Sequence, residues 1–353
     1  MQAKHLKIEA HNDLYNTINK KLKTEINFDK KKSNIYFILK AIFYCTAAIS
    51  SYSLIFIISN PVLYILNFIC FGFISVLLCF NFAHDLSHHS IFKRPFWDNL
   101  GFEFIYTLVG AHPEAWKKRH INSHHFAPNV ANFDTDLAIT GLIRVLPNSD
   151  VKWYHKYQFI YAPFAYMAYS FYWVFIKDFL VLGQFSPSGV LQNIRYYFTF
   201  VFLKSFYISY LLVLPLLFSE QPISVVITAF LLMHMIQSLY TLFTFFITHH
   251  VDNSNYPIAN EEGLISTSWF MNQVESSNDF YPYSKIANFI FGGVNNHIAH
   301  HLFPHINHFH YPKVNRILYD VLKKNNITPN QSTYFGGVIS HLRLLKLRGM
   351  QTV

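Results

Sequence analysis

Long uninterrupted apolar segments are the clearest pattern along this chain of 353 residues. Four of them reach the roughly 20 residues that an α-helix needs to cross the hydrocarbon core of a bilayer. They occupy residues 35–59, 62–83, 198–218 and 223–248. Only 13% of the residues are charged, whereas soluble domains have about 25%, so four buried helices of a soluble core are a poor alternative. The sequence therefore predicts an all-α integral membrane protein with four transmembrane helices.

A fifth apolar stretch, residues 158–182, is also long enough to span but contains Pro163 and the charged pair Lys177 and Asp178. It is crowded with Tyr and Trp, which concentrate at the membrane–water interface. We predict that it lies on the cytoplasmic membrane surface as an interfacial helix. A further crossing here would put the histidine clusters described below on opposite sides of the bilayer.

Basic residues are unevenly distributed around the predicted spans. The N-terminal arm, residues 1–34, contains eight lysines, and the chain after residue 310 is also basic, whereas the turns at 60–61 and 219–222 have no positive charge. By the positive-inside rule both termini, including a C-terminal tail at 326–353, and the long central loop are cytoplasmic. The net charge of +9 then reflects orientation and attraction to anionic membrane lipid, and we expect no nucleic-acid partner. No apolar segment precedes residue 35, so we expect no cleavable signal peptide.

Histidine forms the second informative pattern, because imidazole is the commonest protein ligand for transition metals. Three clusters stand out, namely His84-x-x-x-His88-His89, His120-x-x-x-His124-His125 and His297-x-x-His300-His301. One ion accepts about six ligands at most in an octahedral site. Three clusters with eight or nine candidate ligands therefore indicate at least two ions.

The spacing within the clusters suits ligands on helices. The first cluster begins where the second predicted span ends, so a continued helix puts His84 and His88 on one face. The second cluster repeats this i, i+4 spacing. Consecutive helical side chains point about 100° apart, so a doublet such as His124 and His125 can serve two ions. Asp85 either hydrogen-bonds an imidazole, caps a helix or pairs with a basic residue.

The fourth predicted span ends in His249 and His250, on the same side of the membrane as the end of the second span. His249 is a good candidate for a further ligand. His250 is a weaker one, because a histidine at a helix C-terminus also interacts favourably with the helix dipole. The roles of His89 and His305 stay open.

The type of metal centre follows by elimination. Structural zinc sites have four ligands and usually cysteine, but the three cysteines lie inside apolar runs. A mononuclear iron oxygenase would use two histidines and a carboxylate. What remains is a dinuclear centre at the membrane surface, where the natural substrate is a lipid chain. Unactivated C–H bonds require a metal–oxygen oxidant, which indicates di-iron and O2.

With these residues in place, the chain resembles the membrane fatty acid desaturases, in particular the bacterial acyl-CoA or acyl-lipid desaturases of the linoleoyl-CoA desaturase-like group. The matching motifs are His84-Asp85-x-x-His88, Arg119-His120-x-x-x-His124-His125, His297-x-x-His300-His301-Leu302-Phe303-Pro304 and Tyr311-Pro312-Lys313. The resemblance covers residues 35–325, which we expect to be the desaturase domain. It implies four spans and a cytoplasmic helical cap that holds two iron ions, in the bacterial inner membrane.

The resemblance also implies a site and a reaction. By motif, the expected metal ligands are His84, His88, His120, His124, His125, His249, His297, His300 and His301. The family removes two hydrogens from adjacent methylenes of a fatty acyl chain, using O2 and two external electrons. The acyl carrier could be CoA, a carrier protein or an intact lipid. The sequence has no fused cytochrome domain with a heme-binding motif, so we expect a separate electron donor such as a ferredoxin or cytochrome.

Two alternatives remain at this point. A membrane di-iron hydroxylase or ketolase uses the same oxidant, and ligand spacing does not separate it from a desaturase. A non-catalytic metal or heme carrier is more distant, because bis-histidine heme needs facing histidines inside the spans and only His234 lies clearly there. A transporter would need polar residues along a path at mid-depth.

Overall fold

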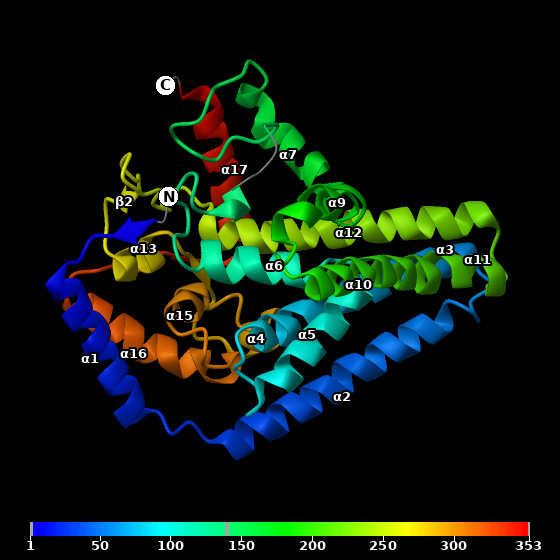
Figure 1. The fold of residues 1–353 in the computed structure, drawn as a ribbon, viewed down its shortest axis with the longest axis horizontal. Helices are drawn as coiled ribbons and strands as arrows, with labels where there is room; N and C mark the ends of the chain where they lie inside the picture. The colour runs from blue at the N-terminus through cyan, green and yellow to red at the C-terminus, as the bar shows by residue number, and fades with distance from the viewer. Residues whose placement is uncertain (1–2, 138–140, 352–353) are drawn as a thin grey trace. The chain divides into compact units, whose positions relative to one another are not determined.

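The computed structural model describes residues 3–137 and 141–351, and its secondary structure is almost entirely helical (Figure 1). The first two and last two residues, which belong to the arms predicted at 1–34 and 326–353, lie outside the described residues. The chain divides into two compact units. Unit 1 consists of Met1–Lys30, Arg119–Pro163 and Phe243–Val353, and unit 2 of Lys31–Lys118 and Phe164–Leu242.

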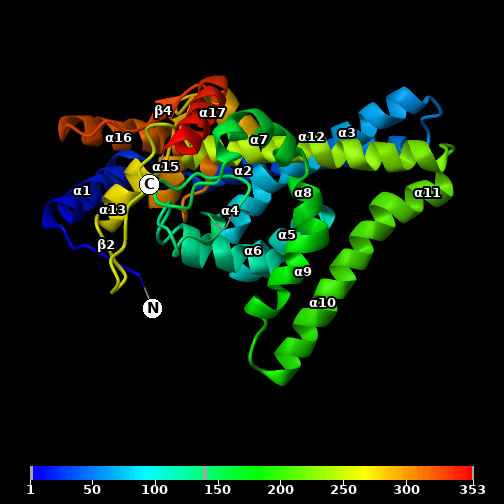
Figure 2. The ribbon, with the colours of Figure 1, turned by 90° about the horizontal axis from the view of Figure 1, so that it is seen from above.

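Four helical segments are long and apolar enough to cross a membrane, as predicted, and Figure 2 shows the last two joined by the turn after α11. The first span is α2 (Lys30–Leu54) and the fourth is α12 (Ile223–His249). The second span consists of α3 (Pro61–Leu78), the π-helical turn η1 (Cys79–Ala83) and α4 (His84–Ser87). The third consists of α10 (Val190–Ile208), the π-helical turn η7 (Ser209–Val213) and α11 (Leu214–Phe218). Their large apolar side chains are in good part exposed, as expected of helices that face lipid.

Local sequence explains where the second span begins. Asn60 stays extended, and its side-chain oxygen accepts hydrogen bonds from the backbone N–H groups of Val62 and Leu63 at 3.0 and 3.1 Å. Pro61 occupies the first helical position, where its fixed φ suits the helix and its missing N–H costs nothing. Helix α2 ends earlier than the apolar run predicted, at Leu54 and not near residue 59, because the chain tightens into turns in which the N–H groups of Ile55 and Phe56 donate three residues back.

Residues 158–182 do not form the single continuous interfacial helix that was predicted. The segment is broken into α7 (Gln158–Met167), α8 (Tyr169–Tyr172), the π-helical turn η5 (Trp173–Lys177), α9 (Asp178–Val181) and the 3-10 turn η6 (Leu182–Phe185). A bend of 58° separates the parts before and after Ala168. At this break the backbone N–H of Ser170 donates to Ser238 Oγ at 2.7 Å in place of a helical carbonyl. The bent pair could form a fifth, broken span, and its place at the membrane surface stays a prediction.

Unit 2 also contains α5 (Pro95–Leu108) and nearly all of α6 (Pro113–Arg119). A buried ion pair joins α10 to the bent segment, with Lys204 Nζ 2.7 Å from Asp178 Oδ2. Asp178 also accepts a hydrogen bond from the backbone N–H of His112, directly before α6. This pair therefore fixes the chain at the entry to α6.

The core of unit 1 is built around the third histidine cluster, which forms α15 (His297–Leu302). Helices α1 (Glu9–Glu25), α13 (Trp269–Glu275) and α16 (Tyr311–Lys324) pack around it, and α1 runs beside α16 (Figure 1). The predicted N-terminal arm thus takes part in the core through Leu14, Ile18 and Leu22. Its first strand, β1 (Lys4–His5), pairs in parallel with β2 (Leu264–Ile265).

The predicted C-terminal tail is also ordered. Strand β4 (Gln331–Ser332) pairs in parallel with β3 (Asp279–Phe280), which precedes α14 (Lys285–Phe291), and α17 (Tyr334–Met350) follows β4. In α17, the buried His341 donates from Nδ1 to the carbonyl of His250 at 2.8 Å. The remaining short elements are 3-10 turns, η3 (Thr135–Leu137), η4 (His155–Tyr157) and η8 (His308–His310).

Candidate metal centre

The second histidine cluster lies in a π-helical turn, η2 (His120–His124), that follows α6 directly. The backbone N–H of His125 donates to the carbonyl of His120 at 3.0 Å, an i to i+5 bond. The sequence predicted regular helical i, i+4 pairing of His120 with His124. The rings of His120 and His124 do stack, with centroids 5.5 Å apart, and the wider turn also brings His125 close, with its Nε2 3.1 Å from that of His120. Such single π turns are frequent at functional sites.

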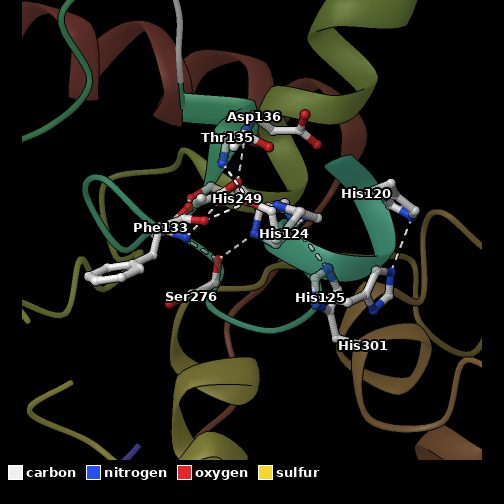
Figure 3. Close-up of polar contacts among 12 residues, drawn as sticks. His120, His124, His125, Phe133, Thr135, Asp136, His249, Ser276 and His301 are labelled. Carbon is white, nitrogen blue, oxygen red and sulfur yellow. Dashed lines mark hydrogen bonds and ion pairs between the residues drawn. The ribbon is translucent and has the colours of Figure 1, made fainter. Parts of the chain in front are cut away.

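The side chains of His124 and His125 nevertheless point in different directions, as predicted. The rings of His124 and His125 are inclined by 86°, with centroids 6.0 Å apart. His124 turns toward the end of α12, where it meets His249 (Figure 3). It also lies in one group with His297 and His301 of α15. His125 turns toward His300, with 3.0 Å between their Nε2 atoms.

Four imidazole nitrogens converge in this first group, the four-histidine cluster His124, His249, His297 and His301. The Nε2 atom of His249 lies 3.0 Å from that of His124, 2.7 Å from that of His297 and 3.1 Å from that of His301. All four side chains are buried, with at most 6% of each residue exposed.

The hydrogen bonds of the outward Nδ1 atoms show which nitrogen of each ring carries the proton. Nδ1 of His124 lies 3.0 Å from Asp134 Oδ2, Nδ1 of His249 lies 2.9 Å from the Ser276 carbonyl, and Nδ1 of His301 lies 2.8 Å from Gln273 Oε1. Each of these partners can only accept, so each Nδ1 carries the proton. A neutral imidazole with a protonated Nδ1 has a lone pair on Nε2. In their neutral, metal-binding form, three of these rings therefore direct lone pairs at one another within the buried cluster.

That arrangement fits a transition metal ion. Metal–imidazole bonds of about 2.1 Å separate neighbouring ligand nitrogens by about 3.0–3.4 Å in octahedral or tetrahedral geometry, close to the separations found here. Nδ1 hydrogen bonds to a carboxylate or carbonyl are also what metal-bound histidines almost always make. Without a cation the converging lone pairs would repel one another, so the donor set matches a metal site and not a hydrogen-bonded histidine cluster.

Electrostatics around the cluster agree with this assignment. Burial would lower the pKa of His124, but the adjacent Asp134 carboxylate outweighs it and raises that pKa. Burial would raise the pKa of Asp134, and His124 together with two backbone N–H groups lowers it below the usual range. Burial, followed by the neighbouring imidazoles, holds the pKa of His301 well below its usual value. Without a metal the raised pKa favours a protonated His124 beside the Asp134 carboxylate, so a cation bound at its Nε2 would displace a proton, as metal binding to histidine ligands does.

The other predicted ligands form two groups, one in each unit. In unit 1, His125 Nε2 is close to the Nε2 atoms of both His120 and His300, and Nδ1 of His300 is 3.3 Å from the hydroxyl of Tyr311. In unit 2, His84 and His88 lie on successive turns with ring centroids 5.7 Å apart, as their spacing predicted.

His89 and His250, whose roles the sequence left open, contact other residues. His89 has a positive φ of 55° and its Nε2 lies 3.4 Å from Lys117 Nζ. Nδ1 of His250 lies 3.0 Å from the Tyr256 hydroxyl, away from the four-histidine cluster. Asp85 interacts electrostatically with Lys40, which favours the pairing alternative over the capping one.

Sequence reasoning did not find the residues that orient the imidazoles. Asp134, Gln273 and Ser276 carry no motif, and only their distance of 10 to 28 residues from the ligands they contact is visible in the chain. Asp134 is further fixed by the backbone N–H groups of Asn129 and Asp136 at 3.0 and 2.9 Å.

Changing Asp134→Asn should weaken metal binding without removing a ligand. The amide can still face His124 Nδ1, but it lacks the negative charge that makes the imidazole a stronger ligand. Loss of such an outer partner typically lowers metal affinity about 10- to 100-fold. Metal retained per chain after graded chelator treatment measures the effect. Asp150→Asn, at an exposed acid of the same unit, is the control, and equal retention in the two variants would contradict the assignment.

Comparison with known proteins agrees with the site. Residues 59–333 match the family model described as "Fatty acid desaturase". The chain is 30% identical over 302 residues to an acyl-lipid (8-3)-desaturase of Physcomitrium patens, covering 83% of this chain and 62% of that protein. It is 27% identical over 289 residues to an sn-1 linoleoyl-lipid 6-desaturase of Arthrospira platensis, covering 80% and 77%.

A Delta(5) fatty acid desaturase A of Dictyostelium discoideum is 25% identical over 367 residues, covering 98% of this chain and 77% of that protein. The chain therefore spans under two thirds of the Physcomitrium patens relative and about three quarters of the other two. The family match includes all three histidine clusters, His249 and three of the four apolar spans. The chain is a multi-pass integral membrane protein that belongs to the fatty acid desaturase family.

Proposed function

We propose that this protein is an O2-dependent fatty acyl desaturase that introduces a double bond into an acyl chain. The observation that carries the proposal is the four-histidine cluster, in which Nδ1 protons are fixed by outer partners and Nε2 lone pairs converge. A membrane family whose relatives are named acyl-lipid desaturases supports the substrate class. An acyl chain attached to a membrane lipid is accordingly the substrate we favour over an acyl-CoA or an acyl-carrier protein.

The metal is proposed to be two iron ions held by the nine histidines predicted from sequence. The four-histidine cluster would hold one ion. For the second ion, the proposal of His84, His88, His120, His125 and His300 rests on the cluster spacing and on the family motif. Two iron ions supply the oxidising power, from O2, that breaking unactivated C–H bonds requires.

The chain's own residues would organise this chemistry in two ways. Asp134, Gln273 and the Ser276 carbonyl hold the imidazole tautomers, so that the ligand set is formed before the metal arrives. Burial of the ligand rings keeps bulk water out of the site, which protects reactive species from side reactions. The balance is two C–H hydrogens, one O2, two external electrons and two protons giving one double bond and two water molecules.

The remaining partners and the orientation are part of the proposal. The two electrons would come from a separate ferredoxin or cytochrome. The distribution of basic residues supports placing both termini and the histidine clusters on the cytoplasmic side, in a bacterial inner membrane.

Expression in a host of known lipid composition tests the function. Gas chromatography–mass spectrometry of the fatty acids should show a new unsaturated species that is absent with the double variant His297→Ala/His301→Ala. Hydroxylated or keto fatty acids in its place would assign the protein to the hydroxylases or ketolases. Two iron ions per chain with no oxidised lipid, in the presence of a working electron donor, would favour a metal carrier.

A further inference from the structure

Helix α16 (Tyr311–Lys324) has two faces of opposite character. Its exposed positions are Lys313, Arg316, Asp320, Lys323 and Lys324, which recur at intervals of three and four residues and so form one stripe. The opposite face is buried in the core of unit 1 through residues such as Val314, Leu318 and Leu322. The exposed stripe of these five residues is called the basic face below.

The buried face of α16 is tied to the metal-binding residues. The hydroxyl of Tyr311 lies 3.3 Å from Nδ1 of His300. Asn315 donates to Asn296, the residue before His297, at 2.7 Å, and to Asp279 at 2.9 Å. Asp279 in turn accepts from the backbone N–H of Ile298 inside α15 at 2.8 Å. Hydrogen bonds therefore run from α16 to the helix that carries three of the proposed ligands.

The basic face has an excess of uncompensated charge. Asp320 is the single acidic residue of α16, and it is shared between Lys324 at 2.8 Å and Lys21 of α1 at 3.6 Å. Within the described part of the chain, Lys313, Arg316 and Lys323 make no ion pair. Helix α1, which packs beside α16, adds the exposed Lys20 and Lys23 to the same region. An acidic partner is the chemistry that this surface fits.

We propose that the basic face of α16 is the docking surface for an acidic, protein-borne one-electron carrier. The inference rests on the proposed function, because only a reaction that consumes external electrons needs such a partner. Each reduced carrier would lose one electron and the protein would accept it, so two carriers serve each double bond formed. A carrier seated at Lys313 and Arg316 stands two to five residues from Tyr311, whose hydroxyl contacts His300.

The test uses the whole chain of 353 residues in nanodiscs and two acidic probe carriers, a plant-type ferredoxin and a b-type cytochrome. Two measurements are made: the Kd of the oxidised carrier for chelator-treated protein, and the rate at which reduced carrier is oxidised by iron-loaded protein under anaerobic conditions. The variant is Lys313→Glu/Arg316→Glu. The matched control is Lys152→Glu/Arg343→Glu, which reverses two exposed charges elsewhere in the same unit.

For at least one carrier, we expect the variant to weaken binding and slow electron uptake by at least about tenfold, and to flatten the decline of the wild-type rate with ionic strength. The control should stay within about twofold of the wild type, and reduction by a small uncharged reductant should be equal in all three proteins.

Several results would overturn the proposal. They are equal carrier binding by variant and wild type, equal loss in the control, or no binding of either carrier to the wild-type protein. A defect seen only in nanodiscs with anionic lipid would assign the basic face to the membrane surface. The proposed function is tested separately by lipid product with the small reductant: a protein that binds the carrier but forms no unsaturated product would contradict the function and leave the docking surface standing.

Discussion

Changing His249→Ala is expected to remove one metal ion and to abolish formation of unsaturated product. Its Nε2 is the atom from which the other three nitrogens of the four-histidine cluster lie 2.7–3.1 Å away. Alanine leaves no donor there, and the imidazoles of His124 and His301 cannot move to close the gap because their Nδ1 atoms are fixed to Asp134 and Gln273. The loss should exceed the roughly 10- to 100-fold effect of removing an outer partner, so we expect at least about a 100-fold fall in product.

The neighbouring histidine provides a matched control. Nδ1 of His250 lies 3.0 Å from the Tyr256 hydroxyl, and its carbonyl accepts from His341, so its contacts are structural. In His250→Asn the side-chain amide can keep the contact with Tyr256. Metal analysis of purified protein and gas chromatography of the lipids measure both variants. Full metal content in His249→Ala, or equal loss of metal in the two variants, would contradict the role given to His249.

His249 also shows how much of the site could be predicted from the sequence. It lies outside the three histidine clusters, yet counting membrane crossings puts the end of the fourth span level with the end of the second, and this made it a candidate. The structure brings it together with His124, His297 and His301. The helical spans followed from apolar length in the same way, because a bilayer imposes a minimum of about 20 residues on each span.

Local departures from regular α-helix could not be predicted from the sequence. The π-helical turn at His120–His124 brings His125 close to His120, and nothing in the residues distinguishes it from an α-helical turn. The break at Ala168 depends on Ser238, 70 residues away, whose Oγ accepts the N–H of Ser170. The start of α10 at Val190 was missed because its first turns contain Gln192 and Asn193, which hydropathy assigns to a loop.

Long-range polar partners were equally invisible. Gln273 and Ser276 orient His301 and His249 from α13 and the residue after it, and their importance appears only when the chain is folded. The arms predicted as cytoplasmic segments contain α1 and α17, because amphipathic helices with many charges do not stand out in a membrane protein dominated by apolar runs. The orientation in the membrane and the second metal ion stay predictions from sequence.

The largest expected effect on stability comes from the buried pair in unit 2. Lys204 Nζ donates to the carbonyls of Gly110 and Val174 and to Asp178 Oδ2 at 2.6–2.7 Å, which uses all three of its protons. The side chains are only 8% and 1% exposed. Changing Lys204→Met leaves the Asp178 carboxylate buried without its counter-charge. Breaking such a pair on one side typically costs about 3–5 kcal/mol of unfolding free energy.

A double-mutant cycle separates the charge from the packing. Asp178→Asn should also destabilise, because it leaves the Lys204 cation buried. The double variant Lys204→Met/Asp178→Asn removes both charges and should be less destabilised than the sum of the single changes. Recovery will be partial, because the N–H of His112 and Trp173 Nε1 both donate to Asp178 and the amide offers one acceptor oxygen for them.

Unfolding in detergent, followed by denaturant titration or by Tm, measures the cycle. Lys324→Met is the matched control, because its pair with Asp320 has nearly the same distance, 2.8 Å, but is exposed on both sides, and exposed pairs contribute little. Additive single effects, or a loss in Lys324→Met as large as in Lys204→Met, would contradict the assignment. Because Asp178 also holds the chain entering α6, whose end leads directly into the second histidine cluster, the single variants should lose bound metal along with stability, and the double variant should regain both together.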